Sequence, residues 1–469
     1  MKRTIAGICL LSFIATLNVT SASAAYDHVV TWSDQSALDL APVLKSQYAS
    51  NGNLLDPVIN DSALTVAITD ADHRVNPLFH IPPQIRPSVE FWLKIYTLYT
   101  TQQVAVFDSR HPEIVYEVLD FRELAHTARN QVVYEILRER RVKAAVHSYV
   151  ATLEHLARTR GRTSGRNPVE TKILAALKGY KGKRSFQEFA HNLRTQTGQR
   201  DNVVKGLLAA EIYFPKMERV LADLGAPTEL SRLTLVESSF DLSAYSRTGA
   251  QGVWQFMPGP GHKLMLIDSE RGIDERLSPL KSTVAAGKML LDSYRRFNNW
   301  ALAITSYNHG LKGLPRLERD KHSNDFGRIA RLFDPNNKAS PLGWAGRNYY
   351  AEFLAMVHAE AYRHLFYGEP PATSIGTVAF RRLEHRGNLV QVAALYGVSV
   401  HELRAANPDV QNMTSPLPEG FLVALPDTAD DIAQLTAKPP RRGRKARQAG
   451  VKLVRSDEAH DARRRHNDL

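Results

Sequence analysis

Hydrophobic and polar positions follow two different patterns in the first half of the chain. Residues 104–107 and 114–121 are rich in β-branched and aromatic side chains, and the segment between them is typical of a turn, so the pattern predicts a β-hairpin. Beyond residue 122, apolar residues recur at helical spacing, with Arg and Lys on the other face. The sequence therefore predicts a mixed α/β N-terminal region, 25–122, and a helical region, 123–200.

The same spacing predicts helices in the rest of the chain as far as residue 366. Their expected bounds are 168–178, 184–195, 200–223, 281–297, 300–308 and 345–366. Pro227 favours the start of a further helix, which carries Leu230, Leu233 and Val236 inward and ends near Glu237. The chain is therefore predicted to be mainly α.

A smaller unit follows a Pro-rich junction and spans residues 378–426. Short extended stretches at its two ends enclose two helical patterns, near 389–396 and 399–406, which predicts a βααβ order. In residues 427–469 Pro, Arg, Lys and Gly dominate. We expect this segment to be a basic disordered tail.

Residues 1–24 have the pattern of a secretory signal peptide. Lys2 and Arg3 precede an apolar stretch, 5–17, and Ala-Ser-Ala at 22–24 is a small-residue cleavage pattern. The apolar stretch is short for a transmembrane helix, and a retained membrane anchor is the alternative. No later stretch of sequence is apolar enough to span a bilayer. Cys9 is the one cysteine and lies in the apolar stretch, so the cleaved chain would have no disulfide, thiolate nucleophile or Cys metal ligand.

Charge is concentrated at the C-terminus. The 469 residues carry 60 Lys and Arg and 48 Asp and Glu, a net charge of +12. The last 32 residues hold 11 of the basic and 4 of the acidic residues, so seven of the twelve surplus charges lie there. The rest of the chain lacks the charge of a nucleic-acid-binding surface, and nucleic-acid binding by the tail is an alternative that rests on this charge run alone.

Glu237 is the first candidate for chemistry. It follows an apolar helical face, 233–236, and precedes two serines. Burial disfavours the charged form of a carboxyl, so a carboxyl in this position can donate a proton near neutral pH, as cleavage of a glycosidic bond requires.

Four motifs follow Glu237 in order. They are Ser-Arg-Thr-Gly-Ala at 246–250, Gly-Val-Trp-Gln-Phe-Met-Pro at 252–258, Asp-Glu-Arg at 274–276 and Tyr-Asn-His-Gly at 307–310. Together with Glu237 they resemble the lytic transglycosylase family that shares a fold with goose-type lysozyme, in particular the membrane-bound lytic murein transglycosylase D group. The resemblance implies a lysozyme-like helical catalytic domain in residues 201–370 that acts on the glycan strands of peptidoglycan.

The resemblance also implies the roles of individual residues. Glu237 matches the family's single catalytic acid/base. The residues implied to bind substrate are Ser246, Gln255, Met257, Tyr307 and Asn308. Ser246 matches the serine that holds the acetamido group of the sugar, and Tyr307 matches the tyrosine that lies against the catalytic carboxyl. Gly249 and Gly252 match glycines that let the backbone pass close to the sugar.

Taken by themselves, several of these residues favour a structural role. Trp254 and Phe256 suit core positions, and the triplet 274–276 is typical of a structural salt bridge. His309 suits a surface or capping position. The loop after Met257 carries proline at position 260, where the family usually has threonine, so we expect it to be stiffer and to lack a hydroxyl.

A single carboxyl is sufficient for the chemistry that the resemblance implies. The acetamido group of N-acetylmuramic acid stabilises the positive charge that develops at the anomeric carbon, and the 6-hydroxyl of the same sugar then attacks within the molecule. The MurNAc-GlcNAc β-1,4 bond is cleaved without water, and the product ends in 1,6-anhydroMurNAc. No cofactor and no metal are expected.

The unit at 378–426 resembles a LysM domain. The resemblance rests on Gly387-Asn388-Leu389, on Tyr-Gly-Val-Ser at 396–399 and on Ala-Asn-Pro at 406–408. The LysM family usually has Gly-Asp-Thr-Leu where this chain has the shorter Gly-Asn-Leu. The alternative is a degenerate module that packs but does not bind glycan.

We therefore expect an exported peptidoglycan lytic transglycosylase of the periplasm or cell envelope, or a secreted one. A lysozyme-type hydrolase of the same fold is the alternative enzyme, and it differs in that water attacks instead of the 6-hydroxyl. A non-catalytic glycan-binding protein of the envelope is the alternative from another class. Glu237 beside Ser246, Gln255 and Tyr307 argues against it, since binding alone does not require the acid.

Overall fold

The structure is a computed structural model in which residues 61–162, 165, 167–182, 185–368, 377–427 and 431–437 are described. The expected signal peptide and nearly all of the expected basic tail lie outside these residues. The described chain is mainly helical with small sheets, as the sequence predicts. None of its described helices is both long enough and apolar enough to cross a membrane.

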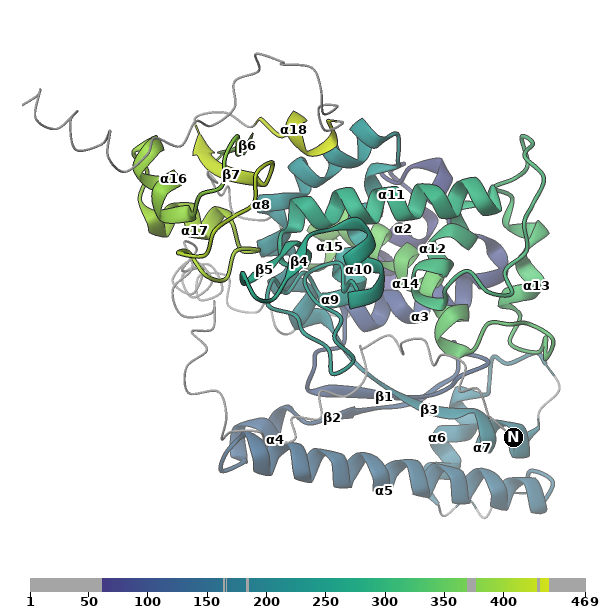
Figure 1. The fold of residues 1–469 in the computed structure, drawn as a ribbon. Helices are drawn as coiled ribbons and strands as arrows, with labels where there is room; N and C mark the ends of the chain where they lie inside the picture. Colours follow the sequence, from purple (N-terminus) through teal and green to yellow (C-terminus); the bar gives the residue numbers. More distant parts are fainter. Residues whose placement is uncertain are drawn as a thin grey trace, which may run out of the picture. The chain divides into compact units, whose positions relative to one another are not determined.

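The chain divides into two compact units. The first combines described residues 61–207 with 290–368, and the second combines 208–289 with 377–437. The chain passes from one unit to the other within α8 (Arg200–Leu224) and within α11 (Pro279–Phe297) (Figure 1).

A three-stranded antiparallel sheet organises one part of the first unit. The predicted hairpin is confirmed as β1 (Gln103–Asp108) and β2 (Val115–Asp120). The helix predicted over 184–195 is wrong at its last three residues, because α7 (Phe186–Asn192) stops and β3 (Leu193–Thr197) pairs with the other edge of β1. Pairing with β1 satisfies the backbone groups of both strands, which outweighs the helical pattern of this short segment.

Helices cover this sheet. They are α4 (Arg122–Thr127), α5 (Gln131–Arg158), α6 (Pro168–Ala176) and α7. The long helix α5 runs along the sheet (Figure 1), and its buried Tyr149, Leu153 and Leu156 pack in one core with Val106 and Tyr116 of the strands.

The rest of the first unit is a helical cluster. Its helices are α2 (Asp61–Thr69), η2 (Pro77–Phe79), η3 (Pro83–Ile85), α3 (Arg86–Thr97), α12 (Trp300–His309), η6 (Phe326–Arg328), α13 (Ala330–Phe333), α14 (Trp344–Ala361) and α15 (Arg363–Phe366). Helices α3 and α14 pack closely, and the buried Trp92 donates from Nε1 to Asn348 Oδ1 at 3.0 Å.

The second unit begins with the end of α8 and contains the segment around Glu237. Its elements are η4 (Thr228–Arg232), α9 (Leu233–Ser238), α10 (Pro258–Leu264), β4 (Ile267–Asp268), β5 (Ile273–Asp274) and η5 (Glu275–Leu277). Pro227 precedes a 3-10 turn that leads into α9, and Leu230, Leu233 and Val236 are buried as predicted.

The C-terminal part of the second unit has the predicted βααβ order. Its elements are β6 (Thr377–Arg382), α16 (Leu389–Tyr396), α17 (Val400–Ala406) and β7 (Leu422–Asp427), and β6 pairs with β7 antiparallel. We call these residues, 377–427, the C-terminal module. In the short Gly-Asn-Leu motif, Asn388 caps α16 and forms a capping box with Gln391.

Ordered structure continues beyond the C-terminal module, where the sequence predicted a tail. Asp431 pairs with Ala379 of β6, and α18 (Ala433–Thr436) follows. Ile432 and Leu435 are buried, so two apolar side chains anchor residues that the surrounding polar composition had assigned to solvent.

The C-terminal module shares its core with the β4–β5 hairpin of the same unit. Ile273 belongs to one buried cluster with Leu389, Leu403 and Val410, and the Asp274 N–H donates to the Asp409 carbonyl at 2.8 Å. The module is therefore packed against the hairpin by main-chain and side-chain contacts.

A buried ion pair reinforces this packing. Lys281 Nζ lies 2.6 Å from Asp409 Oδ2 and 3.2 Å from Glu275 Oε1, and the Lys281 and Asp409 side chains are almost fully buried. Burial alone would lower the pKa of the Lys281 ammonium, but Asp409 and Glu275 outweigh it and raise this pKa. Lys281 thus remains charged and cross-links the hairpin region to the C-terminal module.

Candidate active site

Glu237 lies in the last turn of α9, and its side chain is half-buried. Leu233 to Val236, which precede it, are buried, so the helix presents the carboxyl at the end of a buried face, as predicted. The helix ends in an unusual way, because both Ser239 (φ 50°) and Phe240 (φ 57°) adopt the left-handed conformation. Such residues cost about 1–3 kcal/mol each and persist only where the surroundings hold them.

Packing of Phe240 holds this helix end in place. Its ring is 1% exposed and lies 5.7 Å from the ring of Tyr213 and 5.6 Å from that of Phe214. Tyr213 and Phe214 both belong to α8. The packing of Phe240, three residues beyond Glu237, against Tyr213 and Phe214 thus fixes the end of α9.

The loop of residues 244–257 is tied directly to the Glu237 helix. Ser238 Oγ, next to Glu237, donates to the Val253 carbonyl at 3.0 Å. The loop folds on itself, since Gly252 N–H donates to the Ala244 carbonyl and Gln251 bridges both Tyr245 and Phe256. The structure thereby brings Glu237 into the same local assembly as the loop that carries Ser246, Gln255 and Met257.

Ser246 stabilises a turn within this loop. Its Oγ accepts the Ala250 N–H at 2.8 Å and lies 3.0 Å from Thr248 Oγ1. The side chain is 6% exposed. Binding of a sugar acetamido group by Ser246 stays a prediction.

The side-chain amide of Gln255 is held in one orientation, so that its Oε1 can accept a hydrogen bond. Its φ of 47° is left-handed, and its Nε2 donates to the carbonyls of Gly252 at 2.9 Å and Ala244 at 3.3 Å. The amide is therefore fixed with Oε1 directed away from these carbonyls, and no described residue donates to Oε1. A hydroxyl or amide N–H of a ligand would suit it. Met257 follows as the half-buried N-cap residue of α10.

Arg276 holds the loop of residues 244–257 through several hydrogen bonds. Its guanidinium donates to both oxygens of Asp274, to the carbonyls of Gly249 (2.8 Å) and Phe256 (3.1 Å), and to Gln251 Oε1 (2.7 Å). The predicted salt bridge is confirmed, with both side chains largely buried. Arg276 thus fixes three points of the loop at once, which the sequence did not indicate.

The structure gives a different reason for glycine at position 252 from the one that the resemblance implied. A Cβ there would lie 2.0 Å from the Arg276 carbonyl oxygen, and φ is 75°. The close approach is to the protein's own backbone, so the glycine is required for packing.

The other carboxylates near Glu237 in sequence are engaged with protein groups. Asp241 Oδ1 accepts from the N–H and the Oγ of Ser243. Asp274 is paired with Arg276, and Glu275 accepts the Leu266 N–H and lies close to Lys281.

Trp254 and Phe256 are core residues, in agreement with the structural interpretation of the sequence. Both are at most 2% exposed, and Trp254 Nε1 donates to Thr283 Oγ1 at 2.9 Å. Neither ring is available as a platform for a ligand.

Tyr307 and Asn308 lie in the first compact unit, near the end of α12. Asn299 caps this helix by accepting the Leu302 N–H, and Gly310 (φ 82°) follows it. Tyr307 and Asn308 are half-buried. Their roles in substrate binding stay predictions from the sequence.

Tyr245 is a candidate that sequence analysis missed. It is 70% exposed, although it is bridged to Gln251 and directly precedes Ser246. Exposed aromatic rings on a fixed backbone suit the apolar faces of sugar rings. No helical or strand pattern framed this loop, so the sequence carried no signal for the exposed ring.

The segment that contains Glu237 and the loop of residues 244–257 is similar to a known protein domain. Residues 221–328 match the transglycosylase SLT domain. This match covers α9, the loop of residues 244–257, the Asp-Glu-Arg triplet and α12.

Two relatives extend the comparison. The membrane-bound lytic murein transglycosylase D of Escherichia coli (strain K12) is 27% identical over 213 residues, which are 44% of this chain and 44% of that protein. A protein of Alteromonas sp. (strain M-1) that is named for tributyltin chloride resistance is 32% identical over 135 residues, 28% of this chain and 58% of that protein. The chain thus matches less than two thirds of the length of either relative.

Proposed function

We propose that this protein is a peptidoglycan lytic transglycosylase that cleaves the MurNAc-GlcNAc β-1,4 bond without water and leaves 1,6-anhydroMurNAc ends. Glu237 is the single acid/base: it protonates the leaving oxygen and then accepts the proton of the attacking 6-hydroxyl. The observation that carries this proposal is the half-buried Glu237 at the end of α9, held by Ser238 and Phe240 next to the SLT-domain loop.

The engagement of neighbouring carboxylates supports a single-acid mechanism. An inverting hydrolase needs a second carboxylate to activate water, and a retaining hydrolase needs one as nucleophile unless the acetamido group takes that part. Asp241, Asp274 and Glu275 already accept hydrogen bonds or ion pairs from protein groups. Each of these three carboxylates is therefore already engaged and is not positioned as the base that would activate a water molecule.

The proposal includes the sequence-based assignments of the remaining parts. Ser246, Gln255, Met257, Tyr307 and Asn308 bind the glycan, and the C-terminal module is a LysM-like module. The chain is exported by its N-terminal signal peptide and acts on glycan strands in the periplasm or cell envelope.

The nature of the product tests the proposed mechanism. Purified peptidoglycan digested by the full chain should release muropeptides that end in 1,6-anhydroMurNAc, because the 6-hydroxyl is delivered intramolecularly. Each product is lighter by one water than the hydrolytic product, so mass spectrometry distinguishes the two. Release of mainly reducing ends that carry ¹⁸O from labelled water would identify a lysozyme-type hydrolase. Binding to peptidoglycan without any release would identify a glycan-binding protein.

Tyr245 should contribute to glycan binding but not to the chemical step. Tyr245→Ala is expected to raise KM several-fold and to change kcat little, since an exposed ring that stacks on a sugar contributes about 1 kcal/mol of uniform binding. Steady-state kinetics on soluble glycan chains would measure both constants. Val132→Ala, which removes an exposed apolar side chain on α5, is the control. Equal KM values for Tyr245→Ala and wild type would exclude the platform.

A further inference from the structure

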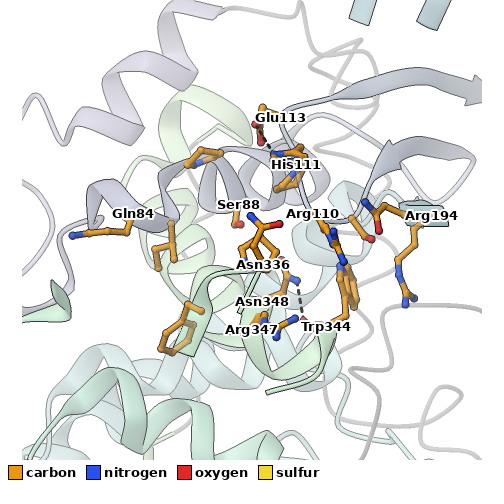
Figure 2. A pocket seen from close by; sticks show the side chains of 17 residues that line it. Gln84, Ser88, Arg110, His111, Glu113, Arg194, Asn336, Trp344, Arg347 and Asn348 are labelled. Atoms are coloured by element: carbon orange, nitrogen blue, oxygen red, sulfur yellow. Dashed lines mark hydrogen bonds and ion pairs between the residues drawn. The ribbon is translucent and has the colours of Figure 1, made fainter. Parts of the chain in front are cut away.

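The first compact unit contains a basic pocket that the proposed mechanism does not use. The pocket has a volume of about 490 Å³, within the range of pockets that hold small ligands. It is lined from four places in that unit: the start of α3, the β1–β2 turn, the start of β3, and α13 with the first turn of α14. Figure 2 shows Arg110, Arg347 and Trp344 around it.

The lining carries more positive than negative charge. Arg110, Arg194 and Arg347 all line the pocket, and among the described residues no carboxylate forms an ion pair with any of them. Glu113 is the one described carboxylate in the lining, and it lies 3.6 Å from His111 Nδ1. Three guanidinium groups against this one carboxylate leave the lining with surplus positive charge, which favours an anion.

Arg347 shows the effect of this crowding most directly. Its Nε is buried without a hydrogen-bond partner, while Nη2 donates to the Asn337 carbonyl at 3.1 Å. Burial lowers the pKa of the Arg347 guanidinium; Asp334 opposes this change, and Arg110 lowers the pKa further. A bound anion would remove the repulsion between Arg110 and Arg347.

The helix ends at the pocket reinforce the preference for an anion. Helices α3 and α14 both begin there, and neither has a side-chain cap or an acidic residue in its first turn. The Arg86 N–H of α3 donates to the Pro83 carbonyl and Pro87 has no N–H, so α3 contributes mainly its dipole, while the first N–H groups and the dipole of α14 favour negative charge in the pocket.

The remaining lining residues indicate what kind of anion fits. Asn192 is 8% exposed, and no described residue hydrogen-bonds with its side-chain amide. Asn336 adds a second amide, while Pro87, Pro335 and Trp344 add apolar surface. Amides pair with peptide groups, and the volume exceeds that of a single small anion.

We propose that this pocket binds a short anionic peptide through its carboxylates. The peptide branch of peptidoglycan would supply such a peptide, and this last step rests on the proposed function. The arginines would bind the carboxylates, Asn192 and Asn336 the peptide groups, and Trp344 the aliphatic parts. The pocket would then recognise the peptide-bearing part of the substrate separately from the glycan.

Calorimetric titration of the full chain with the tripeptide L-Ala-γ-D-Glu-meso-diaminopimelate tests the proposal. Wild type should bind the tripeptide, and Arg110→Gln and Arg194→Gln should each weaken binding at least about 10-fold, since each removes one charge-assisted contact. Arg140→Gln, which removes an exposed arginine on α5 of the same unit, should bind like wild type. Arg194 is exposed, so its replacement keeps the test valid if Arg110→Gln does not fold.

Three results would overturn the proposal: no binding of the tripeptide, equal binding by wild type and both pocket variants, or tighter binding of inorganic phosphate than of the tripeptide. Cleavage of peptide-free glycan strands by wild type is measured in parallel. Cleavage without tripeptide binding rejects the pocket and leaves the proposed function standing. Tripeptide binding without cleavage of any glycan retains an anionic-peptide pocket and rejects the proposed function.

Discussion

Replacing Glu237 by glutamine is expected to lower the rate of peptidoglycan cleavage at least about 100-fold, because general acid–base catalysis contributes about 10²–10⁴-fold to rates. Glutamine keeps the size of the side chain but cannot transfer a proton. Since α9 is held by its buried face and by Phe240, the unfolding temperature should stay within a few degrees of wild type. Release of soluble muropeptides and a thermal melt measure the two effects.

Two matched variants make this prediction specific. Glu229→Gln makes the same change in the 3-10 turn before α9, and Asp241→Asn neutralises the nearest acid after Glu237. Both should cleave at rates close to wild type. If Asp241→Asn were as inactive as Glu237→Gln, the reaction would use two carboxylates and the single-acid mechanism would be wrong.

Replacing Arg276 by alanine is expected to cost about 3–5 kcal/mol of unfolding free energy, the range for breaking one partner of a buried ion pair. The change leaves the buried Asp274 charge unpaired and removes the donors to the Gly249 and Phe256 carbonyls. The loop of residues 244–257 should loosen, so kcat/KM should fall even at temperatures where the protein stays folded. Urea unfolding and glycan kinetics measure these losses.

The double variant Arg276→Ala/Asp274→Ala separates the ion pair from the loop contacts. It should recover part of the stability, because no charge is left buried and unpaired, but it should not recover activity. Arg271→Ala breaks a more exposed pair with Asp268 on the neighbouring hairpin and should cost at most about 1 kcal/mol. Full activity of Arg276→Ala at wild-type stability would show that the loop does not depend on this residue.

Local sequence patterns predicted the elements whose partners are close in the chain. The β1–β2 hairpin follows from two apolar runs around a turn, and the βααβ order follows from alternating strand and helix periods. The segment of Leu193 to Thr195 was predicted as helix because its pairing with β1 joins residues about 90 positions apart, which no local pattern reports.

The candidate site was predicted to a different degree for each residue. Glu237 at the end of a buried helix face and the Asp274–Arg276 pair were evident from residue type and spacing. The contacts from Arg276 to the Gly249 and Phe256 carbonyls were not predictable, since main-chain acceptors carry no sequence signal. Exposure of Tyr245 likewise depends on the folded loop.

The buried pair of Lys281 and Asp409 has a consequence for the order in which this protein matures. Lys281 leaves the ribosome 128 residues before Asp409, and until then its ammonium has Glu275 but not Asp409 as a partner, and Ile273 lacks the side chains of the module that bury it. Chains fold from the N-terminus as they are synthesised, so the β4–β5 hairpin completes its packing only after the C-terminal module has been made. A chain that stops before residue 409 would lack both the Asp409 partner of Lys281 and the side chains of the module that bury Ile273, so the segment of residues 273–281 would stay incompletely packed.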